Sequence, residues 1–275
     1  MSAHDEHPLE GLEAGARTVA LAAVESIHGR YQREIVESLN VCPFARKSRE
    51  LGRVHRPVYF GAEHPAPATV AADLLALDRA HPDAEIVLLT FPCGGSHPWS
   101  RPANFEAFLS ELRTAWADLH PPRAWYMVAF HPNHRRSDGR ARTQDNLVPD
   151  LRRSPDPVIQ CVNAEVLDQV RREAQRVAHE RMRKELEATH PELVELFARS
   201  VQPDPELSAD IARANFENLG DDGGFARLGL ALADIHAARD LAYAPLDPRL
   251  ALAGLYDGAR ENGAAAEEGD DPEAG

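Results

Sequence analysis

The stretch IVLLTF at residues 86–91 decides the fold of this chain. It is a short, uninterrupted apolar run, which is typical of a strand buried on both faces of a sheet. Further strands are predicted at 54–60 and 125–130, and helical spacing of apolar residues predicts helices between the strands, at 68–80 and 105–119. The chain therefore alternates strands with helices around this stretch.

This alternation predicts an α/β fold, because strands that alternate with helices of this length form βαβ units. We expect a small, largely parallel sheet of about three or more strands with flanking helices, followed by a helical C-terminal section. In such sheets ligands bind at the carboxyl ends of the strands. Two turns follow such ends, PCGG at 92–95 and His131-Pro132, so a ligand site is expected at this edge.

Four sections are expected along the chain. Both ends have a low-complexity composition, which is typical of disorder. The sections are a disordered N-terminus at 1–15, an α/β core at 16–162, a helical section at 163–257 packed on the core, and a disordered acidic tail at 258–275.

Three helices are predicted close to the candidate motifs. Apolar spacing predicts one amphipathic helix at 16–39. A short helix should begin at Pro43, because proline suits the first helical position, and should end near Gly52. Ser154 is an N-cap type of residue followed by proline, so another short helix is predicted at 155–161.

Composition and charge argue against several classes of partner. The net charge of −14 disfavours nucleic acid, and no apolar run approaches the roughly 20 residues that a membrane span needs. The N-terminal residues are too acidic for a signal peptide. The three cysteines are far apart, which favours free thiols over disulfides or structural zinc. We expect a cytoplasmic protein with no nucleic-acid and no membrane partner.

Two basic islands interrupt this acidic chain. Residues 46–56 carry five Arg or Lys side chains against the single acid Glu50, and residues 123–153 carry seven arginines. Such islands indicate a local site for a small anion, and solvated surface arginines would give the same pattern.

Four motifs occur in order along the chain: LNVCPFA at 39–45, FHP at 130–132, RSPDP at 153–157 and DIARANFENLGDDG at 210–223. With them the chain resembles, from about residue 35 to 228, a bacterial family known only as a domain of unknown function, whose members read LNLCPFA, FHPDY and NRSPYP. The resemblance implies no reaction. It implies that certain residues of this chain occupy positions of the family's sequence motifs. These residues are Asn40, Cys42, Pro43, Phe44, His131, Pro132, Arg153, Ser154, Pro155, Pro157, Arg213 and Asn215.

The chain departs from this family pattern at three positions. His134 stands where the family has Tyr, Arg152 where it has Asn, and Asp156 where it has Tyr. The resemblance therefore gives these three side chains no role.

Cys42 is the candidate nucleophile or redox thiol. It precedes a predicted helix start and two cations, and both features lower the pKa of a thiol. The alternative is a small buried apolar residue beside Phe44, because free cysteine is among the most buried residue types.

His131 is the candidate base, because an imidazole at the rim of a sheet titrates near neutral pH. It could equally be a structural residue that hydrogen-bonds the loop. A third reading joins His131 and His134, with Cys42 or Asp138, in a metal site, although the proline between the two histidines restricts their convergence.

Arg153 and Ser154 are the candidate anion clamp, since a helix N-terminus next to an arginine binds phosphate or carboxylate. A simple helix cap with a solvated arginine is the alternative. Asn40 and Arg46 are expected to complete the substrate contacts. No Gly-rich phosphate loop is present, so no nucleotide cofactor is indicated and the cofactor is unknown.

The leading hypothesis is a small-molecule enzyme of unknown reaction class that binds an anionic substrate between Cys42, His131 and Arg153. The alternatives are a non-catalytic binding or scaffolding protein and a metal-dependent enzyme that uses His131. The charged helix at 163–188 is a candidate homodimer surface, although solvation explains its charges equally well.

Overall fold

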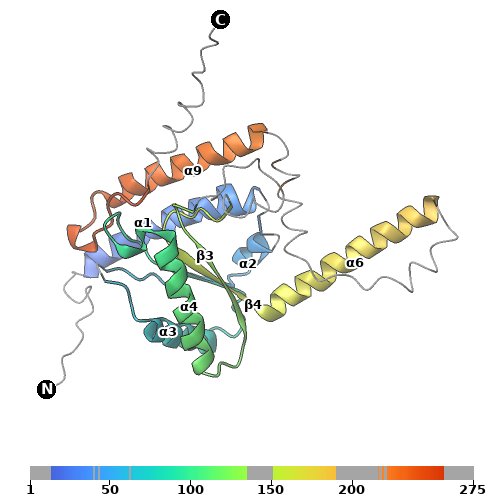
Figure 1. The fold of residues 1–275 in the computed structure, drawn as a ribbon, viewed down its shortest axis with the longest axis horizontal. Coiled ribbons are helices and arrows are strands. Elements are labelled where there is room, and N and C mark those ends of the chain that lie inside the picture. Colours follow the sequence, from blue (N-terminus) through green and yellow to red (C-terminus); the bar gives the residue numbers. More distant parts are fainter. Residues whose placement is uncertain are drawn as a thin grey trace, which may run out of the picture.

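The computed structural model describes residues 14–39, 41–42, 44–61, 63–134, 151–189, 216, 219 and 222–256. It shows an α/β protein in which one sheet separates two groups of helices, with α6 extending away from the rest (Figure 1). The elements are α1 (Ala14–Tyr31), η1 (Gln32–Glu37), α2 (Ala45–Glu50), β1 (Val54–His55), α3 (Pro67–Ala80), β2 (Ile86–Thr90), η2 (Pro98–Ser100), α4 (Pro102–Asp118), β3 (Trp125–Phe130), β4 (Val158–Asn163), α6 (Ala164–Thr189), α9 (Asp222–Tyr243) and η5 (Pro248–Leu250).

The four described strands have the order β1-β2-β4-β3. β1 pairs with β2 in parallel, as expected, but β4 is antiparallel to both of its neighbours. The prediction of an α/β fold is confirmed, whereas the prediction of a largely parallel sheet is wrong. The three predicted strands do run in one direction, but β4 lies between β2 and β3 and separates them.

The strand β4 corrects the helix that was predicted at 155–161. Prolines on both sides of Asp156 favour extended backbone, since the residue before a proline is pushed out of the helical region. The sequence VIQCV that follows is rich in β-branched residues, which pack well on a pleated sheet. The segment after Ser154 therefore leads into the strand β4, which begins at Val158, and not into a helix.

Two apolar cores hold the layers together. On one face of the sheet, inward-facing residues of β2, β3 and β4 pack against α3 and α4, with Leu74 and Leu112 completely buried. In the second core, α1 packs against α9 through residues such as Val24 and Ile235. Each such buried aliphatic side chain contributes roughly 1.5–3 kcal/mol. Because α9 shares this core, it is packed directly against the N-terminal helix.

Most predicted helices are confirmed within a few residues. Helix α2 is followed by Gly52 at a φ of +71°, a left-handed conformation that glycine adopts without strain. Helix α4 begins at Pro102, three residues before the start predicted at 105, and its N-cap residue is Arg101.

Several expectations lie outside the described residues. They include the sequence ends, apart from Ala14 and Gly15, which belong to α1 and were expected to be disordered. They also include Asn40, Pro43, Arg213 and Asn215. In the described part of the chain, no helix is both long and apolar enough to span a bilayer.

The turn after β2 makes a close backbone contact with the C-terminal segment. Gly95 donates its N–H to the carbonyl oxygen of Ala253 at 2.8 Å. A Cβ atom on Gly95 would overlap the carbonyl oxygen of Gly254, and one on Gly94 would overlap that of Ala251. The two glycines therefore permit this contact, which brings the segment after α9 to the carboxyl end of β2.

Candidate functional site

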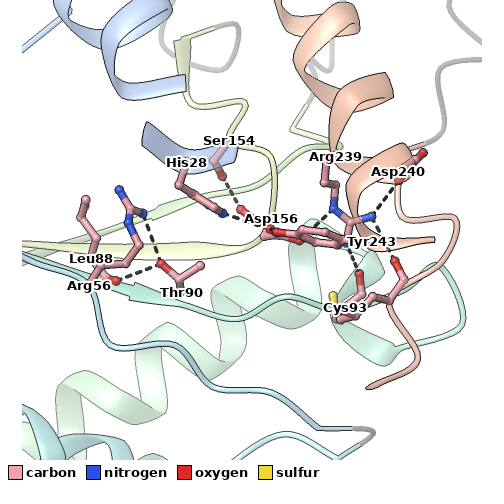
Figure 2. A network of polar contacts seen from close by, with 11 residues as sticks. His28, Arg56, Leu88, Thr90, Cys93, Ser154, Asp156, Arg239, Asp240 and Tyr243 are labelled. Carbon is pink, nitrogen blue, oxygen red and sulfur yellow. Dashed lines mark hydrogen bonds and ion pairs between the residues drawn. The ribbon is translucent and has the colours of Figure 1, made fainter. Parts of the chain in front are cut away.

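A buried carboxylate, Asp156, is the centre of a polar network at the sheet edge (Figure 2). Its side chain is 0% exposed. One carboxylate oxygen accepts two hydrogen bonds from Arg239, at 2.9 Å from Nε and 2.8 Å from Nη2. The other accepts the hydroxyl of Tyr243 at 2.7 Å and lies 3.0 Å from Nε2 of His28. Side chains from α1 and α9 thus meet on a residue that lies just before β4.

Helical spacing explains why these polar groups are buried. His28 lies four residues after Val24 and three before Tyr31, on the apolar face of α1. Arg239 lies four residues after Ile235 on the apolar face of α9. The two helices pack together through these faces, so their polar residues are brought to one place.

Arg239 is fully satisfied by hydrogen bonds. Its five N–H groups make five bonds, two of them to Asp156. The others reach the Asp240 carboxylate and the carbonyl oxygens of Leu252 and Cys93. The guanidinium therefore joins α9 both to β4 and to the turn after β2.

The charges of the network follow from its geometry. Burial alone would raise the pKa of Asp156, but Arg239 and His28 outweigh this effect and lower it below its ordinary value. Burial lowers the pKa of His28 to about 4, and the hydrogen bond to Asp156 opposes this only in part. At neutral pH the centre therefore contains an ionised carboxylate, a cationic Arg239 and a neutral His28.

Arg56 lies near the network, directly after β1, but unlike Arg239 it does not bind a carboxylate among the described residues. Its partly buried guanidinium makes one long hydrogen bond, 3.4 Å from Nη1 to Oγ1 of Thr90. Within the described part of the chain no carboxylate is close enough to form an ion pair with it. Burial lowers the pKa of Arg56 to about 10, and Glu25, Tyr243 and Asp156 only partly offset this effect.

The structure places Cys42 in an apolar setting. The residue packs against Phe44, Ile86 and Val162. Burial raises the pKa of its thiol to about 11, although the backbone N–H groups of Phe44 and Ala45 oppose the shift. These surroundings favour the thiol over the thiolate at neutral pH, as in the alternative reading of Cys42 as a small apolar residue.

Cys42 is not brought together with His131 and Arg153. It packs on Val162, near the end of β4, whereas the other two residues lie at the beginning of β4, near Val158. Four residues of a strand span about 13 Å. The expected triad is therefore not assembled, because its members lie at opposite ends of the sheet.

His131 has no ring nitrogen left for a substrate. Its Nε2 donates to the carbonyl oxygen of Trp99 at 2.7 Å, and its Nδ1 accepts the backbone N–H of Asn133 at 3.0 Å. The ring is buried, and burial lowers its pKa to about 4. The arrangement corresponds to the alternative reading, in which His131 fixes the loop after β3.

Ser154 and Arg153 do not form the expected clamp at a helix N-terminus, since β4 stands where the helix was predicted. Ser154 is buried and its hydroxyl donates to the backbone oxygen of Asp156 at 2.5 Å. Arg153 donates to the hydroxyl of Tyr256 at 2.9 Å and to the carbonyl oxygen of Pro132 at 3.4 Å.

The first basic island is largely neutralised by acids. Arg49 binds the buried Glu37 with two hydrogen bonds, and the exposed Arg46 lies 3.7 Å from the same carboxylate. Arg53 pairs with Glu85. Arg46 therefore has a structural partner, and Arg56 is the arginine of this island that lacks one among the described residues.

A further buried histidine, His236, lies in α9, three residues before Arg239. It is 0% exposed, and neither ring nitrogen has a hydrogen-bond partner among the residues that the structure describes. Its ring stacks on Tyr256 at a centroid distance of 4.2 Å. Burial lowers its pKa to about 3, and Arg153 and Arg239 add to this effect. The imidazole is therefore neutral at physiological pH.

Sequence reasoning missed His28, Arg239 and Tyr243 and included Arg56 only as a member of a basic island. The signal was present, since a charged residue at an apolar helix position predicts a buried partner. The partner itself, Asp156, is one of the three departures from the family pattern.

The part of the chain that the structure describes contains no group of three or more His, Cys, Asp or Glu side chains placed to bind a metal ion. No protein-family model, curated protein or solved structure matches this chain. The resemblance to a domain of unknown function stays a prediction.

Proposed function

We propose that the chain binds a small organic anion at the carboxyl ends of β1 and β2, with Arg56 as its cationic contact. One observation carries the proposal: Arg56 is a partly buried guanidinium that has a single 3.4 Å hydrogen bond and no carboxylate within ion-pair distance among the residues described. The site also lies at the strand ends where ligands of α/β sheets collect.

An unpaired cation that is partly buried is energetically unfavourable. A guanidinium that loses part of its hydration without gaining a counter-ion is destabilised, by less than the several kcal/mol of a completely buried ion. Arg239 avoids this cost through Asp156, whereas Arg56 does not. A bound anion would supply the missing partner and would gain charge-assisted hydrogen bonds in a weakly screened setting.

The proposal keeps the anionic ligand of the leading hypothesis and changes the residues that hold it. Cys42 has no part in it, because it lies at the far end of the sheet with a raised pKa. Binding without catalysis and catalysis on the bound anion both need the Arg56 contact. The proposal therefore covers the enzyme and the binding-protein alternatives.

Substitution of Arg56 by Gln tests the proposal. We expect acetate, used as a probe, to stabilise the wild-type protein saturably against heat, with binding at least ~10-fold weaker in Arg56→Gln. Arg46→Gln is the matched control, because Arg46 belongs to the same island but is exposed and near Glu37. Equal acetate binding by the wild type and Arg56→Gln would exclude the proposed site.

Two further parts of the proposal concern the setting of the protein. We place it in the cytoplasm, which is supported by three cysteines that are all free thiols. We also propose that the charged surface of α6 forms a homodimer contact. Sedimentation velocity at two protein concentrations would test for this dimer.

A further inference from the structure

The segment after η5 is anchored at the carboxyl edge of the sheet as far as Leu255. The carbonyl oxygen of Leu252 accepts a hydrogen bond from Nη1 of Arg239 at 3.1 Å, and that of Leu255 accepts one from Nδ2 of Asn133 at 2.9 Å. The side chain of Leu255 is buried in the core beside the sheet. Tyr256 comes next and is only partly buried, so its side chain can turn away without loosening these anchors.

Two polar residues hold the ring of Tyr256. The imidazole of His236 stacks on it at a centroid distance of 4.2 Å and an interplanar angle of 8°. Arg153 donates from Nη2 to the Tyr256 hydroxyl at 2.9 Å, and its guanidinium carbon lies 5.5 Å from the ring centroid. A flat stacking surface beside a cation that binds a ring oxygen is a recognition set for an aromatic ring that carries an oxygen.

Tyr256 satisfies this set only in part. The imidazole of His236 is completely buried, yet within the described part of the chain neither ring nitrogen makes a hydrogen bond. Buried polar groups of this kind lose water without compensation. Arg153 binds a neutral hydroxyl, whereas an anionic oxygen would form a stronger, charge-assisted hydrogen bond. The closed arrangement therefore carries a cost that falls when Tyr256 leaves, since water then reaches the imidazole.

We infer that the place filled by the Tyr256 ring is a second binding site, and that Tyr256 is its internal competitor. The ligand class is a small aromatic ring that carries a carboxylate or phenol oxygen. Its ring stacks on His236 and its oxygen accepts hydrogen bonds from Arg153. Only a flat ring keeps the nearly parallel contact with the imidazole, so an aliphatic carboxylate of the same size is a poor ligand.

This site is separate from the anion site proposed at Arg56. Arg153 also donates to the carbonyl oxygen of Pro132, in the loop after β3, whereas Arg56 follows β1. The strand order places β1 and β3 at opposite edges of the sheet. The inference therefore does not rest on the proposed function.

Removal of the internal competitor tests the inference in the full chain. Isothermal titration calorimetry with 4-hydroxybenzoate as the probe should show binding at least ~10-fold tighter in Tyr256→Ala than in the wild type, because the site is then always open. Tyr256→Leu is measured as a second open form, so that the test also holds if Tyr256→Ala does not fold. Cyclohexanecarboxylate, which has the same charge and no flat ring, should show no such gain.

Variants at the arginines locate the bound probe. Arg153→Gln added to Tyr256→Ala should weaken 4-hydroxybenzoate binding at least ~10-fold. Arg152→Gln is the matched control, because this neighbouring arginine makes no hydrogen bond to Tyr256. In NMR spectra of Tyr256→Ala, the His236 ring protons should shift upfield when the probe stacks on them, and the His236→Gln variant assigns these signals.

The outcomes also separate this inference from the proposed function. Equal binding of 4-hydroxybenzoate by the wild type and both open forms would overturn the inference, as would a gain that is unaffected by Arg153→Gln. A gain that disappears when Arg56→Gln is added to Tyr256→Ala would overturn it and leave the Arg56 site in place. Acetate binding that does not depend on Arg56 would overturn the proposed function alone.

Discussion

At the scale of single residues, three of the buried histidines differ in hydrogen bonding because their neighbours differ. His131 is bonded at both ring nitrogens, His28 at one, and His236 at neither. All three are neutral at neutral pH, since burial lowers the pKa of each. Residue type and position in the sequence do not distinguish them, but the hydrogen-bond partners do.

Cys42 provides a prediction at this scale. Because burial raises its pKa to about 11, alkylation should be slow at neutral pH and should accelerate only in strongly alkaline solution. Mass spectrometry after timed iodoacetamide treatment, read separately for each cysteine, would measure the pH profile.

The same experiment contains its own controls. Cys93 and Cys161 are buried, so they should stay unlabelled until the protein unfolds. In denaturant all three thiols should react with the ordinary pKa of about 8.5. Fast labelling of Cys42 in the folded protein with a pKa below that value would return it to the list of candidate nucleophiles.

At the scale of elements, the strand β4 makes the sheet differ from the largely parallel sheet that the sequence predicted. β4 lies between β2 and β3, which run in the same direction. It runs in the opposite direction, so both of its pairings are antiparallel. Its insertion also carries Asp156 into the centre of the molecule, because the residues just before β4 lie at the carboxyl ends of β2 and β3. The topology of the sheet and the location of the polar network therefore have the same cause.

The contact between the turn after β2 and the C-terminal segment gives a prediction for elements. Gly95→Ala should destabilise the protein by about 2 kcal/mol, because a Cβ would push the backbone of Gly254 away. Thermal unfolding would measure the change. Gly229→Ala is the control: this exposed glycine of α9 has open space around it, so the variant should gain roughly 0.5–1 kcal/mol of helix stability. Equal effects of the two substitutions would contradict the close contact.

At the scale of the whole molecule, the Asp156 network connects elements that lie far apart in the sequence. Asp156 binds His28 in α1 and Arg239 in α9, and Arg239 binds the carbonyl oxygen of Cys93 after β2. A buried ion pair of this kind is a weak source of net stability, but removal of one partner is strongly destabilising. The network therefore ties the N-terminal helix, the C-terminal helix and the sheet into one cooperative unit.

The buried histidines predict the response of the whole molecule to acid. In the unfolded chain they bind protons near pH 6.5, whereas in the folded protein they do so only near pH 4 for His28 and His131 and near pH 3 for His236. The free energy of unfolding should be nearly constant between about pH 7 and 8 and should fall as the pH decreases from about 6.5 towards 4, by about 2–3 kcal/mol for each of these histidines. Urea unfolding at a series of pH values would measure this slope.

Variants at His236 and His120 sharpen this prediction. His236→Phe keeps the stacking on Tyr256 and removes two unsatisfied nitrogens, so it should reduce the loss of stability between about pH 6.5 and 4 by about 2–3 kcal/mol and raise stability at neutral pH. His120→Asn changes an exposed histidine and should leave the slope unchanged. An unaltered slope in His236→Phe would contradict the burial of a neutral imidazole at this position.

Much of the framework could be predicted from the sequence, because local patterns determine local structure. The apolar runs of β2 and β3, the spacing of α1 and α3 and the glycine after α2 each specify an element through short-range preferences. These signals also predict a ligand site at the carboxyl ends of the strands. That site stays a prediction, and Arg56 and Asp156 are the buried or partly buried charged residues that lie there. The helix predicted at 155–161 failed because capping and strand signals overlap in a short Pro-rich segment, and pairing between two other strands decided the outcome.

The sequence by itself determined the elements, the alternation of strands and helices and the presence of basic islands, since each depends on residues within a few positions of one another. The tertiary structure alone decided which charges are paired and which are not. Arg49, Arg53 and Arg239 find acids 12, 32 and 83 residues away, whereas the described chain offers none to Arg56. The physical reason is that ion pairing and burial are properties of three-dimensional contacts, and identical arginines acquire opposite roles through them.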